Sequence, residues 1–501
     1  MNKNSLFSLF FCSYVLTLEC FSLLFVYTNQ QHKSISGDDR MKAKKTWRYL
    51  FRFLCSFFLA ALATGSFAIT WHEFVKVNNQ TGHLLGHANL LMSFLIYAGL
   101  FTIICNWMGA FRIGVIRKSR SVASLNLGII TTNLLEVFAS MAITGEFRFA
   151  FAFLRLYFFL SIGQILVLSV VMILMINLYW GIVPPTNLLV IEGCHGNHLV
   201  QNMTRLKHKY VISKAIPENL SSNRLVDEIA QAEAVLINDV DSQKQNDIVK
   251  ACFYLNKRVY VVPKLSDIIL KTSEHLNVVD TPLYLCRNLG MSLINRIIKR
   301  AFDISMSLLG IIITFPLWIV VSIAIKLEDH GPVFFKQERV TRDEKRFLIL
   351  KFRSMIVDAE KDGRPHPAGE HDDRITKVGR VIRACRIDEL PQLLNILKGD
   401  MSIVGPRPER WEHVVEYSKR IPEFPYRHKV KGGLTGYAQV YGKYNTSALN
   451  KLKMDLIYIT NYSFLLDLQI IFETLKILFQ KESTEGFDAE GIIEMHDSVH
   501  P

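Results

Sequence analysis

Long apolar stretches limit the fold of this chain more than any other feature of its sequence. A helix needs about 20 apolar residues to cross the ~30 Å hydrocarbon core of a bilayer. Stretches near that length run from Trp47 to Trp71, Asn89 to Trp107, Leu125 to Ile143 and Leu156 to Val183. Backbone polar groups in lipid must be satisfied within the segment, so these stretches predict four transmembrane helices within residues 41–186.

The sequence leaves the status of residues 1–40 open. Leu6 to Tyr27 is apolar but contains Glu19, and the basic run that begins at Met41 would suit the start of a protein with four spans. A removable signal peptide fits poorly, because no small-residue cleavage site follows at the usual spacing. We therefore expect either an N-terminal extension or an extra span.

Basic residues mark one side of the predicted helices. They flank the start of the helix predicted from Trp47 and lie in the loop before Leu125. They are Lys42, Lys44, Lys45, Arg48, Arg52, Arg112, Arg117, Lys118 and Arg120. The loop from His72 to His87 contains a single lysine, Lys76, and no arginine. Because basic loops face the cytoplasm, we expect everything after Val183 to be cytoplasmic. Attraction to an anionic leaflet accounts for the net charge of +13, and no nucleic-acid partner is expected.

Residues 187–285 change to short segments of strand and helix character. The strings LLVIEG, AVLIND and RVYVVP predict buried strands, and Leu225 to Ala232 predicts a helix. This βαβ order predicts a small Rossmann-like cytoplasmic domain. Its glycine loop, Gly193 to Gly196, lacks the GxGxxG spacing that brings pyrophosphate to the backbone, so we do not expect dinucleotide binding.

Two adjacent carboxylates, Asp388 and Glu389, stand just before a helix that Pro391 begins and Gly399 ends. Its expected apolar stripe is Leu390, Leu393, Leu394 and Leu397. Adjacent residues inside a helix do not share a face, whereas at a helix start the free N–H groups and the dipole stabilise anions. A simple acidic helix start remains the alternative for this string alone.

Arginines surround the acidic pair in sequence. Arg383 and Arg386 precede it, and Arg407 follows within the stiff turn Gly405-Pro406-Arg407-Pro408. Guanidinium groups bind phosphate through paired hydrogen bonds. Carboxylates together with arginines therefore predict a site that acts on phosphate groups.

An ordered set of strings gives a more specific interpretation. It comprises GPVFFKQERV, LKFRSM, DDRIT, RIDELPQLL, GPRPE and GGLTGYAQVYGKYN, between residues 331 and 445. Together they resemble the bacterial sugar transferase family, the monotopic phosphoglycosyl transferases, in the form that carries several membrane spans. The resemblance covers about residues 295–480 and implies a mainly α-helical catalytic domain over residues 295–485, followed by a tail over 486–501.

Ala301 to Ile325 is apolar enough to cross the membrane, with Pro316 near its middle. A full crossing would separate the phosphate-handling strings from the cytoplasm, whereas a proline kink allows the chain to return to the same leaflet. The resemblance implies such a re-entrant helix over residues 301–325, although Phe315 replaces the serine that is usual before the proline. A further complete span is the alternative. Asp303 is expected to pair with Arg300 at the headgroup level.

The resemblance also implies a reaction. It is transfer of a sugar-1-phosphate from a UDP-sugar to undecaprenyl (polyprenyl) phosphate with release of UMP, at the bacterial cytoplasmic (inner) membrane. This is the first membrane step in making an exopolysaccharide, capsule or O-antigen repeat unit. Asp388 would form an aspartyl phosphosugar, and Glu389 would hold Mg²⁺, a hard cation that prefers oxygen ligands.

Further site residues follow from the same resemblance. Arg383 and Arg407 would bind phosphate, with Lys299 and Arg300 near the lipid headgroup. The nucleotide pocket would be formed by Gly433, Thr435, Gly436, Tyr437 and Gln439. Site roles for Asp455, Asp467, Lys351 and Arg353 are left open, because each could equally stabilise the fold.

Other functions were weighed. A membrane-bound nucleotide-sugar dehydratase needs a YxxxK pair, and both pairs here, Tyr210 with Lys214 and Tyr260 with Lys264, are poorly placed. A non-catalytic scaffold of polysaccharide assembly would not need adjacent acids. A polytopic transferase would carry its paired aspartates between spans, whereas Asp372-Asp373 lies in a long soluble region. The sequence identifies neither the sugar nor the oligomeric state, although the spans offer surface for a homo-oligomer.

Overall fold

The computed structural model describes residues 37–78, 87–145, 147–193, 199–200, 203, 208–286, 291–357, 359, 372–442 and 446–478. The apolar stretch Leu6 to Tyr27 and the predicted tail 486–501 lie outside these residues. The chain divides into two compact units, Met1–Val262 and Pro263–Pro501. The division falls inside the segment 187–285 that the sequence groups together.

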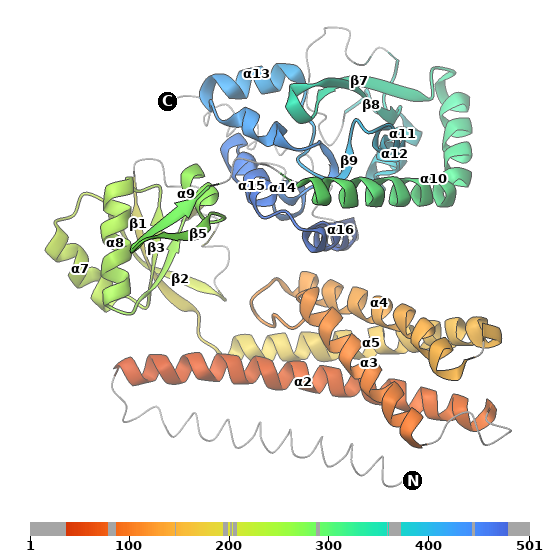
Figure 1. Cartoon of the computed structure of the whole chain (residues 1–501), viewed down its shortest axis with the longest axis horizontal. Helices are drawn as coiled ribbons and strands as arrows, with labels where there is room; N and C mark the ends of the chain where they lie inside the picture. The colour runs from red at the N-terminus through yellow and green to blue at the C-terminus, as the bar shows by residue number, and fades with distance from the viewer. Residues whose placement is uncertain are drawn as a thin grey trace. The chain divides into compact units, whose positions relative to one another are not determined.

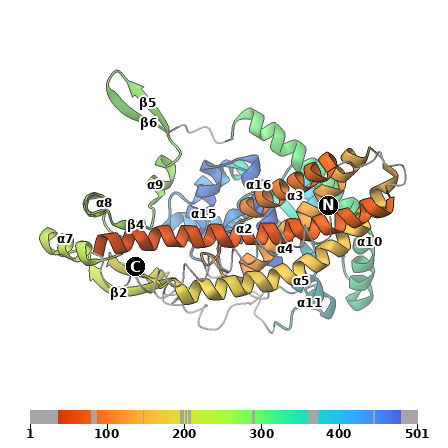
Figure 2. The ribbon, with the colours of Figure 1, turned by 90° about the horizontal axis from the view of Figure 1, so that it is seen from below.

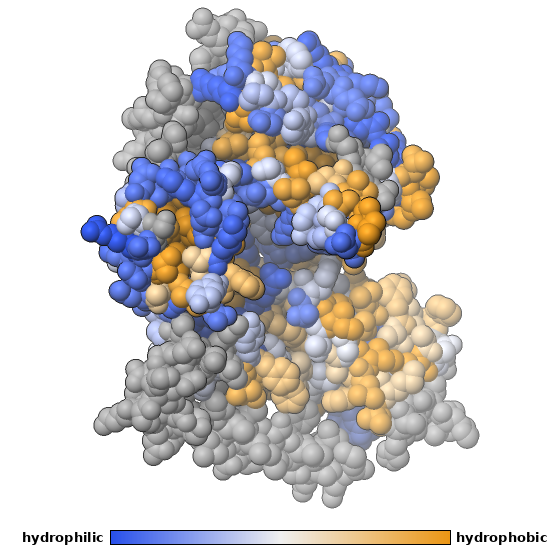
Figure 3. Space-filling model, turned by 60° about the vertical axis from the view of Figure 1, so that its left-hand side comes forward, coloured by the Kyte–Doolittle hydropathy of each residue, from blue (hydrophilic) through white to orange (hydrophobic). Residues whose placement is uncertain are grey.

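Long apolar helices form the first part of unit 1, as predicted (Figure 1). They are α2 (Gly37–Asn78), α3 (His87–Trp107), α4 (Lys118–Thr144) and α5 (Ala150–Ile182), with the short helix η1 (Phe147–Phe149) before α5. Figure 2 shows α2 and α5 running alongside each other, and Figure 3 shows hydrophobic side chains on the outer surface of this bundle. Together with α10 (Leu293–Asp329) of unit 2, five helices in the described part of the chain are long and apolar enough to cross a bilayer, so the protein is a membrane protein.

Aromatic rings fill the interior of the bundle. The rings of Phe67 and Tyr97 stack with their centroids 4.1 Å apart, and Trp71 packs on Phe153 at 5.7 Å. These residues are buried, whereas side chains such as Leu166 and Val167 of α5 point outward. The apolar residues therefore serve two surfaces, one packed inside the bundle and one facing lipid.

A polar network lies within this apolar interior, centred on Gln164. Its Nε2 donates to the carbonyl of Ala63 at 3.0 Å and to Ser66 Oγ at 2.9 Å, and its Oε1 accepts from Asn133 Nδ2 at 2.9 Å. The hydroxyl of Tyr97 donates to Asn133 Oδ1 at 2.9 Å. Since polar groups in lipid seek partners on other helices, this network fixes how α2, α3, α4 and α5 face one another.

A parallel sheet follows the bundle in unit 1. Its strands are β1 (Thr186–Glu192), β2 (Tyr210–Pro217), β3 (Ala234–Asn238) and β4 (Arg258–Val261), in the order β2-β1-β3-β4. The helices α7 (Ser222–Gln231) and α8 (Ser242–Tyr254) connect them. Three strands and α7 are confirmed. The sequence missed β2, because this edge strand buries only Ile216 and so lacks a strand-like apolar pattern.

Unit 2 begins with α9 (Leu265–Leu270) and the exposed hairpin of β5 (Glu274–Val278) and β6 (Thr281–Leu285). The long helix α10 (Leu293–Asp329) leads to the antiparallel strands β7 (Phe334–Val340) and β8 (Arg346–Phe352), with η2 (Arg342–Glu344) between them. The chain then forms α11 (Lys377–Ala384), η3 (Ile387–Glu389), α12 (Gln392–Lys398), β9 (Ser402–Val404), α13 (Trp411–Arg420), η4 (Phe424–Lys429), β10 (Gly433–Thr435), α14 (Tyr437–Tyr441), α15 (Ala448–Thr460) and α16 (Phe464–Leu478).

Helix α10 changes direction along its length, as Figures 1 and 2 show, and Pro316 lies inside it. A proline removes one helical hydrogen bond, which accounts for a bend. The second half of α10 contributes Trp318 to a core with Phe352 of β8 and Ile382 of α11. In the first half, Gly310 lies so close to Leu393 of α12 that a Cβ there would be 3.1 Å from its methyl carbon. The helix is thus part of the core of unit 2.

The predicted pairing of Arg300 with Asp303 is wrong, because both have other partners. Asp303 Oδ1 accepts hydrogen bonds from Ser402 Oγ and from the backbone N–H of Ile403, both at 3.0 Å. Arg300 donates to the carbonyls of Ile396 and Leu397 at 2.6 and 2.7 Å. These two charged residues hold β9 and the end of α12 against α10 instead of facing a headgroup together.

Replacing Gln164 with leucine should destabilise the bundle by about 1–2 kcal/mol, because its partners on three other helices would lose hydrogen bonds. The thermal unfolding midpoint of the full-length protein in detergent measures this. Val167→Leu is the control, because this side chain lies three residues further along α5 and is exposed. It should leave the midpoint unchanged. Equal midpoints for Gln164→Leu and the wild type would contradict a structural role for the network.

Candidate active site

The acidic pair lies on the short helix η3, immediately before α12. Arg386 begins this turn in the left-handed conformation, with φ 54°. Pro391 then starts α12, and Gly399 ends it with φ 100°. The predicted helix start and stop are confirmed, and the acids lie in the turn just before the helix, as predicted. The predicted stripe is wrong at Leu394, which is 38% exposed, because Ile396 faces the core in its place.

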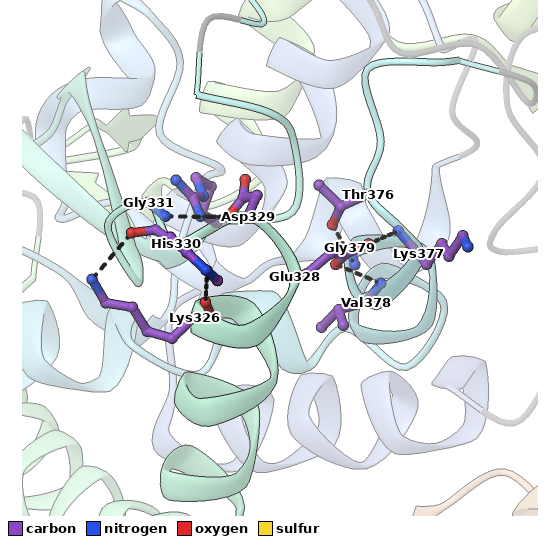
Figure 4. A network of polar contacts seen from close by, with 10 residues as sticks. Lys326, Glu328, Asp329, His330, Gly331, Thr376, Lys377, Val378 and Gly379 are labelled. Carbon is purple, nitrogen blue, oxygen red and sulfur yellow. Dashed lines mark hydrogen bonds and ion pairs between the residues drawn. The ribbon is translucent and has the colours of Figure 1, made fainter.

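A carboxylate at the end of α10 holds α11, the helix that leads into this turn (Figure 4). Glu328 accepts hydrogen bonds from the backbone N–H groups of Lys377 at 2.6 Å and Val378 at 3.1 Å. Thr376 caps the same helix by accepting from the N–H of Gly379 at 2.9 Å. Free N–H groups at a helix start favour such anions. The end of α10 therefore fixes the start of the segment that carries Arg383 and then Asp388.

Glu389 links three segments of the catalytic domain. Its Oε1 accepts from Lys351 Nζ of β8 at 2.9 Å and lies 3.3 Å from an Arg407 guanidinium nitrogen. Arg407 belongs to the turn between β9 and α13, so strand, acidic turn and arginine turn meet at one oxygen. Lys351 and Arg407 are both named as candidate site residues in the sequence analysis. Only the structure shows that Glu389 is the partner of both.

The two acids experience opposite electrostatic environments. Burial raises the pKa of Asp388, and the neighbouring charge of Glu389 adds to this, while Lys351 and Arg383 only partly offset it. Burial acts in the same sense on Glu389, but Lys351 and Arg407 outweigh it and hold the pKa of Glu389 well below its usual range. Adjacent carboxylates whose environments separate their pKa values are typical of sites with divided roles.

A small pocket opens beside Glu389. Its lining residues are Arg339, Ile349, Lys351, Glu389, Gln392, Arg407, Pro408 and Gly433. Three cationic side chains thus surround one carboxylate, which gives the pocket a net positive charge suited to an anion. Gly433 brings the predicted nucleotide segment to this pocket. Asp388 is not among the lining residues and lies on the adjacent turn.

Arg339 is the charged residue of the pocket that the sequence analysis did not name. It lies on β7 and donates to the Pro408 carbonyl at 3.2 Å and to Gln337 Oε1 at 2.6 Å. Burial lowers the pKa of Arg339 to about 10, and the nearby charge of Arg407 contributes in the same sense. The string GPVFFKQERV contained it, but a basic residue in a strand carries no sign of which face it occupies.

The glycine-rich segment is built on close backbone contact. Strand β10 pairs with β9, and a Cβ on Gly433 would lie 2.1 Å from the Gly405 nitrogen, so only glycine fits there. Gly436 packs equally closely, against the Gly405 carbonyl. The contact places Gly433 beside the turn that carries Arg407.

The other three residues of the predicted nucleotide pocket are Thr435, Tyr437 and Gln439. Thr435 is buried, and its hydroxyl is 2.6 Å from that of Thr474. Tyr437 is half-buried, with its ring 4.5 Å from the ring of Tyr441. The Oε1 atom of Gln439 is buried without a hydrogen-bond partner among the described residues. None of the three lines the pocket around Glu389.

Lys299 and Asp467 form a buried ion pair, 2.6 Å between Nζ and Oδ2. Tyr458 donates to the other carboxylate oxygen of Asp467 at 2.8 Å. Lys299 is 7% exposed and its charge is already paired. This placement favours a structural role for the pair, joining α10 to α16, over contact between Lys299 and a lipid phosphate.

A second buried network supports the back of the arginine turn. Asp455 of α15 lies 2.8 Å from Arg427, which also donates to the carbonyl of Arg407 at 3.0 Å. Arg427 lies 3.6 Å from Glu409 as well. Arg353, which shares the string LKFRSM with Lys351, is buried in an ion pair with Asp329 at the end of α10. Asp455 and Arg353 thus hold the elements that present Arg407 and Lys351.

The donor set at the acidic pair fits a hard cation in part. The described residues contain no group of three or more histidine, cysteine or acidic side chains that could hold a metal. Mg²⁺ is commonly bound by one or two carboxylates together with substrate phosphates, which is the ligand type that Asp388 and Glu389 offer. Both ion pairs of Glu389 use its Oε1 atom.

Asp455 should make stability depend on pH. Burial raises the pKa of this carboxyl from 3.8 to about 6 in the folded protein, so its stabilising contribution is present below about pH 4 and is lost as the pH rises through 6. Relative to Asp455→Asn, the wild type should lose about 2–3 kcal/mol between pH 4 and pH 7. Unfolding midpoints across this range measure it. The exposed Glu416→Gln variant should track the wild type, and a constant difference between Asp455→Asn and wild type would contradict the prediction.

Comparison with known proteins identifies the family to which unit 2 is similar. The family model for bacterial sugar transferases matches residues 294–481. A UDP-N-acetylgalactosamine-undecaprenyl-phosphate N-acetylgalactosaminephosphotransferase of Aeromonas hydrophila is 44% identical over 184 residues, 36% of this chain and 43% of that protein. A UDP-glucose:undecaprenyl-phosphate glucose-1-phosphate transferase of Caulobacter vibrioides is 41% identical over 191 residues, 37% of this chain and 71% of that protein.

A third relative is covered almost completely. The exopolysaccharide production protein PSS of Rhizobium leguminosarum bv. phaseoli is 38% identical over 191 residues, 36% of this chain and 94% of that protein. By contrast, the chain covers 40–43% of the relatives from Aeromonas, Klebsiella and Escherichia. The similarity therefore resides in unit 2, and on that region this chain belongs to the bacterial sugar transferase family.

Proposed function

We propose that this protein transfers a sugar-1-phosphate from a UDP-sugar to undecaprenyl phosphate and releases UMP. Relatives about 40% identical over the catalytic domain carry names for this reaction with different sugars, N-acetylgalactosamine and glucose. The observation that carries the proposal is the cationic pocket of Arg339, Lys351 and Arg407 beside two acids with opposite pKa shifts. Such a pocket suits the diphosphate of a nucleotide sugar.

The proposed reaction has two steps. An oxygen of Asp388 attacks the phosphorus that bears the sugar, and the bond from that phosphorus to the bridging oxygen breaks, so that UMP leaves with the electron pair. A phosphate oxygen of undecaprenyl phosphate then attacks the aspartyl phosphosugar and frees the carboxylate, giving the lipid diphosphate sugar. Covalent catalysis divides one transfer between two anions into two easier displacements.

The environments of the acids support this division of roles. The charge of Asp388 is poorly stabilised by its buried surroundings, which favours bond formation to phosphorus. Glu389 stays ionised and holds Lys351 and Arg407 in place. Mg²⁺ bound at Glu389 and phosphate oxygens would supply further neutralisation of negative charge. The three pocket cations would orient the diphosphate and neutralise the leaving UMP.

The membrane arrangement is part of the same proposal. We propose that α10 is re-entrant at Pro316, that the parallel sheet of unit 1 is a Rossmann-like domain, and that the chain after Val183 lies on the cytoplasmic side of a bacterial inner membrane. The direction change of α10 and the basic loops between the spans support this. The dehydratase alternative is weakened, because Tyr210 and Lys214 both lie on strand β2 rather than on a helix.

Asp388→Asn should reduce UMP release by at least about 10³-fold, because an amide is a poor nucleophile toward phosphorus. The assay mixes full-length protein with undecaprenyl phosphate and a panel of UDP-sugars, which also identifies the sugar. Mass spectrometry of wild type given donor alone should show a phosphosugar adduct at residue 388. Asp343→Asn, an exposed turn residue of unit 2, is the matched control. Undiminished turnover in Asp388→Asn would remove the mechanism.

Arg339→Gln should lower kcat/KM for the UDP-sugar by about 10- to 100-fold, since one charge-assisted contact to phosphate is worth about 1.5–3 kcal/mol. Steady-state kinetics at saturating lipid acceptor measures this. The control is Arg346→Gln on the neighbouring strand, where the side chain is exposed and paired with Glu338. Equal kcat/KM in both variants would exclude Arg339 from donor binding.

A further inference from the structure

A second group of basic side chains lies in unit 1, around the carboxyl end of α5. It is named here the interfacial cluster and consists of Arg48 and Arg52 of α2, Lys118 of α4, and His208 and Lys209 just before β2. These residues come from three separate segments of the chain. Their contacts all lead to the stretch from Asn177 to Thr186, where α5 ends and β1 begins.

The α2 arginines contact this stretch directly. Arg48 donates to the Pro184 carbonyl at 3.1 Å and to Thr186 Oγ1 at 3.4 Å. Arg52 donates to the Tyr179 hydroxyl at 2.8 Å. Spaced four residues apart, the two guanidinium groups lie on one face of α2.

The remaining members approach the same stretch from α4 and from the segment before β2. Lys118 donates to Asn177 Oδ1 at 2.5 Å, with its Nζ 4.5 Å from the centre of the Trp180 ring. His208 packs on that ring with centroids 4.1 Å apart. The carbonyl of Lys209 accepts from the Thr186 N–H at 2.9 Å, which holds the segment in place.

No carboxylate neutralises the cluster within the part of the chain that the structure describes; the partners of its side chains are hydroxyl, carbonyl and amide oxygens and aromatic rings. The Nε atoms of Arg48 and Arg52 are buried without a hydrogen-bond partner among the described residues. Burial lowers the pKa of Lys209, and Arg52 adds to the effect. Burial also lowers the pKa of His208, with Lys209 and Lys118 contributing. Crowded cations with unfilled donors are favourable only when an anion joins them.

We propose that the interfacial cluster binds the phosphate group of an anionic lipid. Tyr179 and Trp180 are the aromatic residues typical of the bilayer surface, and they end a membrane-length helix. Guanidinium and ammonium groups at that level match a lipid phosphate in charge and geometry. A bound headgroup would contact both the bundle and the segment entering β2, and would thereby fasten the sheet to the helices. The transfer reaction plays no part in this inference, because the cluster lies wholly in unit 1.

The test measures lipid retention by native mass spectrometry on full-length protein released from mixed micelles. Separate arms contain phosphatidylglycerol, phosphatidylcholine, polyprenyl phosphate or inorganic phosphate. We expect one phosphatidylglycerol to be retained at least about 10-fold more than phosphatidylcholine. Polyprenyl phosphate is also the proposed acceptor substrate of unit 2, so its retention supports the cluster only if the cluster variants lose it. Equal retention of phosphatidylcholine, or binding of inorganic phosphate without either anionic lipid, would overturn the proposal.

The double variant Arg52→Gln with Lys209→Gln should lose the retained lipid by about 10-fold. Glutamine can keep the hydrogen bond to Tyr179, so the helices should remain in place, and the unfolding midpoint checks this. Arg155→Gln removes an exposed charge near the other end of α5 and should retain lipid as the wild type does. If the double variant does not fold, Lys118→Gln tests the same site. An equal loss in Arg155→Gln, or none in the cluster variants, would contradict the inference.

Discussion

The carboxylate of Glu389 is the point on which the geometry of the catalytic domain depends. Through a single oxygen it joins β8, the acidic turn and the arginine turn, by way of Lys351 and Arg407. Without this carboxylate, the positive charges of Arg339, Lys351 and Arg407 would repel one another at the pocket. One carboxylate among three cations keeps them close while leaving a net positive charge for a phosphorylated substrate. Structure and proposed chemistry therefore rely on the same residue.

The networks around this point resemble one another in form. Asp303, Glu328 and Asp455 each use a carboxylate to fix a segment that carries or supports a site residue. Asp303 holds β9, Glu328 holds the start of α11, and Asp455 reaches the arginine turn through Arg427. Asp303 and Asp455 are buried, whereas Glu328 is exposed. A buried acid does not add much stability by itself, but losing its partner leaves a costly unpaired charge. Positioning rather than stability is their clearest physical role.

Much of the architecture could be predicted because its signals are local. Apolar stretches predicted the long helices, and Pro391 and Gly399 predicted the start and end of α12 next to the acids. Contacts between distant segments could not be read in the same way. Lys351 and Glu389 are 38 residues apart, and Lys299 and Asp467 are 168 apart, so nothing in either string reveals the partner. Strand β2 was missed for a related reason, since an edge strand with one buried side chain has no apolar pattern.

Helix α10 has a practical consequence for handling this protein. Trp318 packs edge-on against Phe352, and Gly310 lies against Leu393 of the helix that follows the acids. Removing α10 to obtain a water-soluble fragment would remove the packing partners of Phe352 and Leu393 next to the acidic turn. Both side chains would then be exposed to solvent. For this enzyme domain, detergent or a lipid disc is a component of the native solvent, and shortening the chain cannot replace it.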